Sequence, residues 1–222
     1  MIRMAWMSLF ILLAVMCFSG MAEAGLTVIG TATYNGNNYN LIYEDDQGLI
    51  WLDYTYTMGG DWESYFNWAS GLNASGVLTY KLNSGISVTW EGDWRLPNTV
   101  DGSRRWGYDG TTTAGFNITS SEMGHMFYKS LGNQGCYDVK GTPGSGWGAD
   151  AAWGLKNKGL FVNLYPETYW SNTEYSKYKE QAWAFSFFSG SQSNNEFKHL
   201  GTRHIGLAVR PGRAVSSSVP AR

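Results

Sequence analysis

The octet Trp90-Glu91-Gly92-Asp93-Trp94-Arg95-Leu96-Pro97 constrains the fold of this chain more than any other stretch. Trp94 carries a large apolar ring with one N–H that needs a hydrogen-bond partner when it is buried. Arg95 adds five donors in a fixed fork, and burying them without acceptors is costly. Pro97 fixes its own φ and keeps Leu96 extended. We therefore expect a rigid segment that buries Trp94 and places Arg95 among carbonyls or carboxylates, in preference to a ligand-facing Arg95.

The first 24 residues have the pattern of a secretory signal peptide. Arg3 precedes an apolar run from Met7 to Phe18, and Ala22-Glu23-Ala24 supplies a cleavage motif before Gly25. The apolar run is too short for a typical membrane span. We expect an exported chain (secreted, periplasmic or at the cell surface) without a stable membrane anchor.

Composition favours one loop-rich domain over residues 25–213, followed by a disordered tail at 214–222. The net charge is −2 and charged residues make up 15%, which argues against a nucleic-acid partner. Gly (28), Tyr (14) and Trp (11) are abundant, so aromatic packing should hold the fold together. Cys17 leaves with the signal peptide, so Cys136 has no partner within the mature chain and is expected to be a buried, inert thiol.

Hydrophobic periodicity predicts short strands and two helices. Asn35-Gly36 marks a hairpin turn, and the apolar run Leu49–Asp53 suits a central strand. Asp61 is the expected N-cap of a helix that ends at Leu72, and Thr119-x-x-Glu122 is the expected capping box of a second helix. Further strands are expected within 77–88 (as a hairpin), at 160–164, at 182–188 and at 205–209, the last stopped by Arg210-Pro211-Gly212.

Two long Gly-rich spans, 98–117 and 135–159, remain without predicted regular structure. Long loops of this kind are often functional. The acids Asp45, Asp46 and Asp53 lack the spacing of a calcium loop and are interpreted as solvated turn residues. His125 has no ligand at metal-binding spacing on its helix and is interpreted as structural, so neither a metal site nor a cofactor is expected.

Six motifs in order resemble the Legionella collagen-like protein C-terminal domain family, a secreted bacterial domain of unknown function. They are Gly48–Asp53, Trp62 with its helix, Trp94–Pro97, Tyr169–Glu174, Ala182-Trp183 and Val209–Pro211, and they span about Leu41 to Pro211. The resemblance implies an α+β, C-type-lectin-like fold: two helices packed on small, mostly antiparallel sheets with long Gly-rich loops. It also implies adhesion, because the characterised member of the family binds sulfated polysaccharides. The Glu-Pro-Asn and Trp-Asn-Asp sets of calcium-dependent lectins are absent, so we expect no calcium-dependent sugar site.

The leading functional hypothesis is a non-enzymatic binding module for carbohydrate or another cell-surface polymer, which aromatic loop residues would contact. The residues expected to bind ligand are Arg104, Arg105, Trp106, Trp147, Trp153, Asn172, Glu174 and Tyr175. Those expected to anchor the structure are Trp51, Trp94, Arg95, Pro97, Trp170, Trp183 and Arg210. A structural or assembly protein of the cell surface, with no sugar ligand, is the alternative.

A glycan-acting enzyme is the less favoured hypothesis. Glycoside hydrolysis needs two carboxylates at a set separation, and no spacing singles out a pair among Glu91, Asp93, Glu167 and Glu174. No Gly-x-Ser-x-Gly nucleophile motif occurs near a predicted strand end. We therefore assign no catalytic residue.

Overall fold

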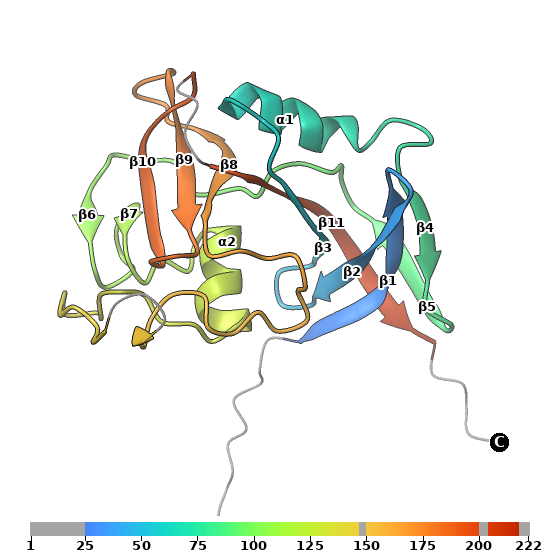
Figure 1. The fold of residues 1–222 in the computed structure, drawn as a ribbon, viewed down its shortest axis with the longest axis horizontal. Helices are drawn as coiled ribbons and strands as arrows, with labels where there is room; N and C mark the ends of the chain where they lie inside the picture. The colour runs from blue at the N-terminus through green and yellow to red at the C-terminus, as the bar shows by residue number, and fades with distance from the viewer. Residues whose placement is uncertain (1–24, 147–149, 200–203, 218–222) are drawn as a thin grey trace, which may run out of the picture.

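Two β-sheets, with helical segments packed on them, make up a β-rich α+β fold in the computed structural model. The structure describes residues 25–146, 150–199 and 204–217. The predicted signal peptide (1–24) therefore lies outside the described residues, as do Trp147 and the last five residues. Within these ranges, no helix is both long enough and apolar enough to cross a bilayer. Figure 1 shows the five-stranded sheet at the left, the six-stranded sheet at the right and α1 across the top.

The six-stranded sheet is antiparallel and has β3 near its middle. Its order is β4 (Thr79–Leu82), β1 (Leu26–Tyr34), β2 (Asn37–Glu44), β3 (Leu49–Tyr56), β11 (Gly206–Ser216) and β5 (Ile86–Trp90). The predicted hairpin turn joins β1 to β2, with Asn35 and Gly36 at φ values of 47° and 79°. Ile50 and Leu52 of β3 face one hydrophobic cluster, and Trp51 faces the other. Burial on both faces explains why this strand is apolar almost throughout.

The five-stranded sheet is assembled from both halves of the chain. Its order is β6 (Trp106–Gly107), β7 (Ala114–Gly115), β10 (Ser191–Phe197), β9 (Gln181–Ser186) and β8 (Thr168–Glu174). The sequence did not predict β10, because its residues are almost all polar. Gln192 is nevertheless buried and donates to Thr113 O at 2.8 Å. Part of the 98–117 span therefore lies directly beside this strand.

Helix α1 (Trp62–Gly71) begins as predicted, with the Asp61 carboxylate accepting from Ser64 N. The second helix differs from the prediction. Its N-cap is Ser121, not Thr119, and α2 (Glu122–His125) continues as a π-helical turn, η1 (Met126–Ser130). Glu122 is not used in a capping box, because Arg95 and the Asn98 N–H take its carboxylate oxygens.

Several strand predictions were wrong at places where distant parts of the chain form the hydrogen bonds of the backbone. The 77–88 segment forms β4 and β5, but these pair with β1 and β11 and not with each other. Residues 160–164 form a loop, since the N–H groups of Val162 and Asn163 donate to Asp53. Asp53 is thus a buried acid, 1% exposed, and not the solvated turn residue that was expected.

The last strand runs through the predicted stop at Arg210-Pro211-Gly212. Its first part pairs with β3 as far as Pro211, and its second part pairs with β5 from Gly212 onward. Proline, which has no N–H, is tolerated at this changeover between partners. Ala214 to Ser216 are therefore strand residues, and the predicted disordered tail began too early.

The octet joins the six-stranded sheet to α2. The Trp94 indole donates to the Tyr80 hydroxyl at 2.7 Å, and the Arg95 backbone exchanges two hydrogen bonds with Val209 of β11. The Arg95 guanidinium binds both oxygens of the Glu122 carboxylate at 2.7 Å. Such bidentate pairs are stronger than single hydrogen bonds. The octet is therefore a structural junction.

Replacing Arg95 with Ala should destabilise the protein, because Glu122 then remains partly enclosed without its cation. We expect a loss of about 1–3 kcal/mol in the free energy of unfolding, measured by chemical denaturation. The matched control is Arg213→Ala, which removes the exposed pair with Glu91 and should cost no more than about 1 kcal/mol. Equal losses in the two variants would contradict the structural role of Arg95.

Candidate functional site

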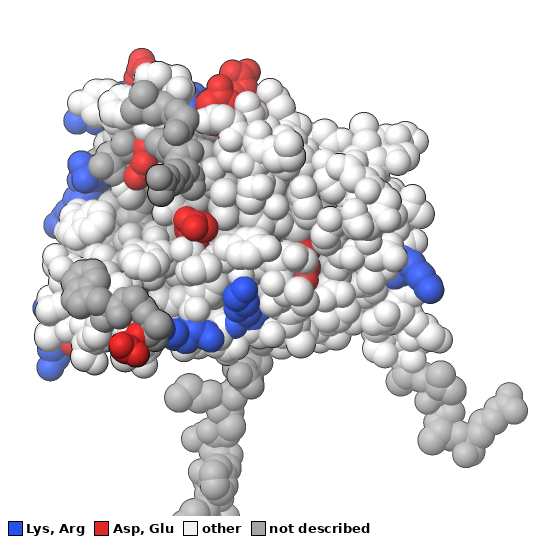
Figure 2. Space-filling view, viewed as in Figure 1, with Lys and Arg blue, Asp and Glu red and all other residues white. Residues whose placement is uncertain are grey.

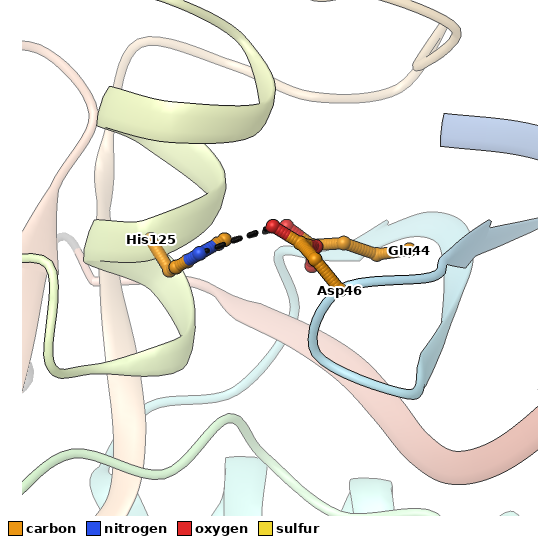
Figure 3. A group of neighbouring side chains, drawn as sticks. All are labelled: Glu44, Asp46 and His125. Atoms are coloured by element: carbon orange, nitrogen blue, oxygen red, sulfur yellow. Dashed lines mark hydrogen bonds and ion pairs between the residues drawn. The ribbon is translucent and has the colours of Figure 1, made fainter. Parts of the chain in front are cut away.

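A polar cluster of Glu44, Asp46 and His125 lies where the β2–β3 turn meets α2 (Figure 3). The side chain of His125 projects from the helix towards the two acids. Its Nδ1 lies 3.4 Å from Glu44 Oε1, and its Nε2 lies 3.2 Å from Asp46 Oδ2. Glu44 is fully buried, whereas the other two are partly exposed.

These three residues place donor atoms within 4.8 Å of one another, which raises the question of a metal ion. The two ring nitrogens, however, face different carboxylates, and one ion can use only one of them. Glu44 also accepts hydrogen bonds from Trp51, Gln47 and the Ser130 hydroxyl, so its oxygens are already engaged. The arrangement suits a protonated imidazole held between two carboxylates better than a metal centre.

A groove between the start of α1, the end of β8 and the end of β10 is the strongest candidate for a binding site. Its volume is about 620 Å³. The lining residues are Asp61, Trp62, Glu63, Phe66, Asn67, Asn172, Glu174, Glu180, Lys198 and His199. Figure 2 shows acidic side chains at the top of the molecule, over the start of α1 and the tips of β9 and β10.

Two aromatic rings from the first turns of α1 form the apolar part of the groove. Trp62 and Phe66 stack with centroids 5.1 Å apart at an interplanar angle of 28°. The Trp62 indole donates to Ser171 O at 2.8 Å, and Lys198 Nζ lies 4.9 Å over its ring. Trp62 is mostly buried, whereas Phe66 is only partly buried. The Trp62 ring is thus fixed, and Phe66 is the more accessible aromatic surface.

Two residues predicted to bind ligand, Asn172 and Glu174, also line the groove. Asn172 is held by its backbone N–H to Pro97 O at 2.8 Å and by its side-chain amide to Asn98. Glu174 is held by the Lys198 ammonium, and this hydrogen bond lowers the pKa of the Glu174 carboxyl. Both side chains are therefore held in place for polar contacts.

Three other predicted ligand residues lie elsewhere, at the opposite edge of the five-stranded sheet. Arg104 and Arg105 are exposed just before β6, and Trp106 is 47% exposed and packs edge-on against Phe116. Basic side chains line this side of the molecule in Figure 2. The sequence predicted one binding surface for all these residues. The fold instead places Asn172 and Glu174 in the groove and the other three at the opposite edge of the sheet.

Two further residues predicted to bind ligand, Trp153 and Tyr175, are covered by other side chains. Trp153 is 4% exposed and packs against Phe188, so it is not an openly exposed ring, although it lines a separate pocket of about 360 Å³. Tyr175 is also 4% exposed, because the β8–β9 connection folds it over Trp183. Trp147 lies outside the described residues.

The residues predicted as anchors pack in or beside the core. Four tryptophans are at most 1% exposed, and Pro97 is buried; the four are Trp51, Trp94, Trp170 and Trp183. Arg210 lies over the Trp90 ring, 4.3 Å from its centroid, and donates to Gly92 O. None of the predicted anchor residues lines the groove.

Sequence reasoning missed Phe66, Glu63, Glu180 and Lys198 as groove residues. The spacing of Trp62 and Phe66 was correctly assigned to one helix face, but period alone does not say where that face reaches solvent. Lys198 follows the unpredicted β10. The His125–Glu44 contact joins residues 81 positions apart, so no local sequence pattern could have predicted it.

The polar cluster predicts a pH-dependent stability. The hydrogen bond that His125 donates to the Glu44 carboxylate raises the pKa of His125 above its ordinary 6.5, although burial opposes the shift. A raised folded-state pKa stabilises the protein fully below about pH 6.5, and this contribution is lost as the pH rises through the folded value. Burial also raises the pKa of Asp46, so this carboxylate destabilises the fold at neutral pH, and the cost is relieved as the pH falls through its folded-state pKa. Unfolding free energies from about pH 6 to about pH 9 should fall further in the native protein than in His125→Gln.

His199→Gln is the control for this experiment, because His199 is exposed and lies outside the polar cluster. It should keep the pH dependence of the native protein. An unchanged pH dependence in His125→Gln would contradict the ion-paired imidazole.

Comparison with known proteins leaves the site to be interpreted from its own geometry. No protein-family model matches this sequence, and no curated protein or solved structure shows significant similarity to it. The groove combines a volume of about 620 Å³, the stacked Trp62–Phe66 pair and the fixed side chains of Asn172 and Glu174. It is therefore our candidate functional site.

Proposed function

We propose that this protein is an exported, non-enzymatic binding module that recognises carbohydrate or another cell-surface polymer in the groove between α1, β8 and β10. The single observation that carries the proposal is the stacked Trp62–Phe66 pair beside fixed Asn and Glu side chains. Aromatic rings pack against the apolar faces of sugars, while amides and carboxylates bind hydroxyl groups. A groove open at the surface suits one part of a long chain.

The state of Glu174 supports binding over hydrolysis. A glycosidase needs one carboxylic acid whose pKa is raised so that it can protonate the leaving group. In the groove, the hydrogen bond from Lys198 shifts the pKa of Glu174 downward, so this carboxyl stays ionised. Of the other acids considered from the sequence, Glu91 pairs with Arg213, and Glu167 lines a separate pocket beside Tyr165.

We also propose that the chain has a C-type-lectin-like fold and belongs with the collagen-like protein C-terminal domains that it resembles. Support comes from two small, mostly antiparallel sheets with helices at their faces and long irregular spans between them. The start of β1 and the end of β11 also lie on the same side of the domain (Figure 1). The apolar run and cleavage motif at residues 1–24 support export.

Phe66→Ala should weaken polymer binding about tenfold or more, since truncating a central aromatic contact costs over 1 kcal/mol. The measurement is a screen of soluble polysaccharides by calorimetry, followed by titration of the best ligand with native and variant protein. Phe66→Tyr should retain binding, because it keeps the ring and the stack on Trp62. A chelator should leave binding unchanged.

Trp106→Ala is the matched control, because it truncates an exposed aromatic at the opposite edge of the five-stranded sheet. Its affinity should equal that of the native protein. Lost binding in Trp106→Ala with normal binding in Phe66→Ala would move the site to the 98–117 span. Failure of the native protein to bind any polymer would favour the structural or assembly role.

A further inference from the structure

The charges around the groove are unevenly distributed. Among the described residues, four carboxylates line it, from Asp61, Glu63, Glu174 and Glu180, whereas Lys198 is the only lysine or arginine in this part of the lining. Lys179 adds one more cation nearby, 3.7 Å from Glu174. The described part of the groove therefore carries excess negative charge, which attracts cations and repels sulfate or carboxylate groups.

Two of these carboxylates already have hydrogen-bond or ion-pair partners within the protein. Asp61 caps α1 by accepting from the backbone N–H and hydroxyl of Ser64. Glu174 is paired with Lys198 and Lys179. Neither acid needs a further cation.

The other two carboxylates are free to meet a ligand. Glu63, in the first turn of α1, and Glu180, just before β9, are both exposed and form no ion pair within the described residues. Glu180 is fixed in position by its carbonyl, which accepts from Lys198 N at 2.8 Å. They lie on different elements but line the same groove as Phe66.

This inference rests on the proposed function of the groove. We propose that the groove selects a polymer of amino sugars with free, protonated amines, in preference to neutral N-acetylated or anionic polysaccharides. The sugar ring stacks on Phe66 beside Trp62, and Glu63 and Glu180 attract the ammonium groups. The basic residues Arg104 and Arg105, which would suit a sulfated polymer, lie at the opposite edge of the five-stranded sheet and do not line the groove.

The test compares glucosamine oligomers with N-acetylglucosamine oligomers of the same length, titrated into the full chain by calorimetry at low ionic strength. The amine-bearing oligomer should bind about tenfold more tightly, and high salt should reduce this difference because the acids are exposed. The double variant Glu63→Gln/Glu180→Gln should reduce the preference to about twofold. The control Glu91→Gln/Glu167→Gln removes the same charge elsewhere and should keep the full preference.

The outcomes separate this inference from the proposed function. Equal binding of the two oligomers, or tighter binding of a heparin oligomer, overturns the amine preference while polymer binding stands. Binding of none of these oligomers counts against the proposed function itself. If oligolysine binds as tightly as the glucosamine oligomer and Phe66→Ala has no effect, the groove recognises charge alone and the amino-sugar proposal is wrong.

Discussion

The pairing of Arg95 with Glu122 ties the six-stranded sheet to α2 at the point where the chain leaves the octet. The backbone N–H and C=O of Arg95 both form hydrogen bonds with Val209 of β11. The Arg95 guanidinium binds the carboxylate of Glu122, the first residue of α2. Glu122 also accepts the Asn98 N–H at 2.6 Å, so the chain leaving the octet is fixed at the same point. A carboxylate with donors on both oxygens is satisfied and can lie in a partly enclosed position.

Residues at the end of the octet also position part of the groove. Pro97, at the end of the octet, accepts the backbone N–H of Asn172 on one groove wall, and the Asn98 amide oxygen accepts from the Asn172 side chain. The other wall is held by Trp62, whose backbone and indole N–H groups donate to Lys198 O and Ser171 O. The polar contacts of the candidate site are thus preorganised by backbone hydrogen bonds from three distant segments, which lowers the entropy cost of binding.

Local patterns predicted those elements whose chemistry is complete within a few residues. The Asn35-Gly36 turn and the Asp61 cap are examples, because positive φ and a free helix N–H are local requirements. Prediction failed where a distant group took the backbone hydrogen bonds. Asp53 holds residues 162 and 163 out of a strand, and β4 and β5 find partners at opposite edges of a sheet. The polar strand β10 has no apolar alternation to reveal it.

The sequence by itself determined the aromatic anchors and the rigid octet, since large rings and an Arg between Trp and Leu-Pro must be enclosed and satisfied. It also pointed to Asn172 and Glu174. Only the tertiary structure decided which aromatic residues reach solvent: Trp153 and Tyr175 are covered, and Phe66 is left at the edge of the groove. It also brought Glu44 to His125 and four acids to one groove. The physical reason is that the exposure of a side chain and its distance from other charges depend on contacts between segments far apart in sequence. The spacing of residues along the chain carries no information about these contacts.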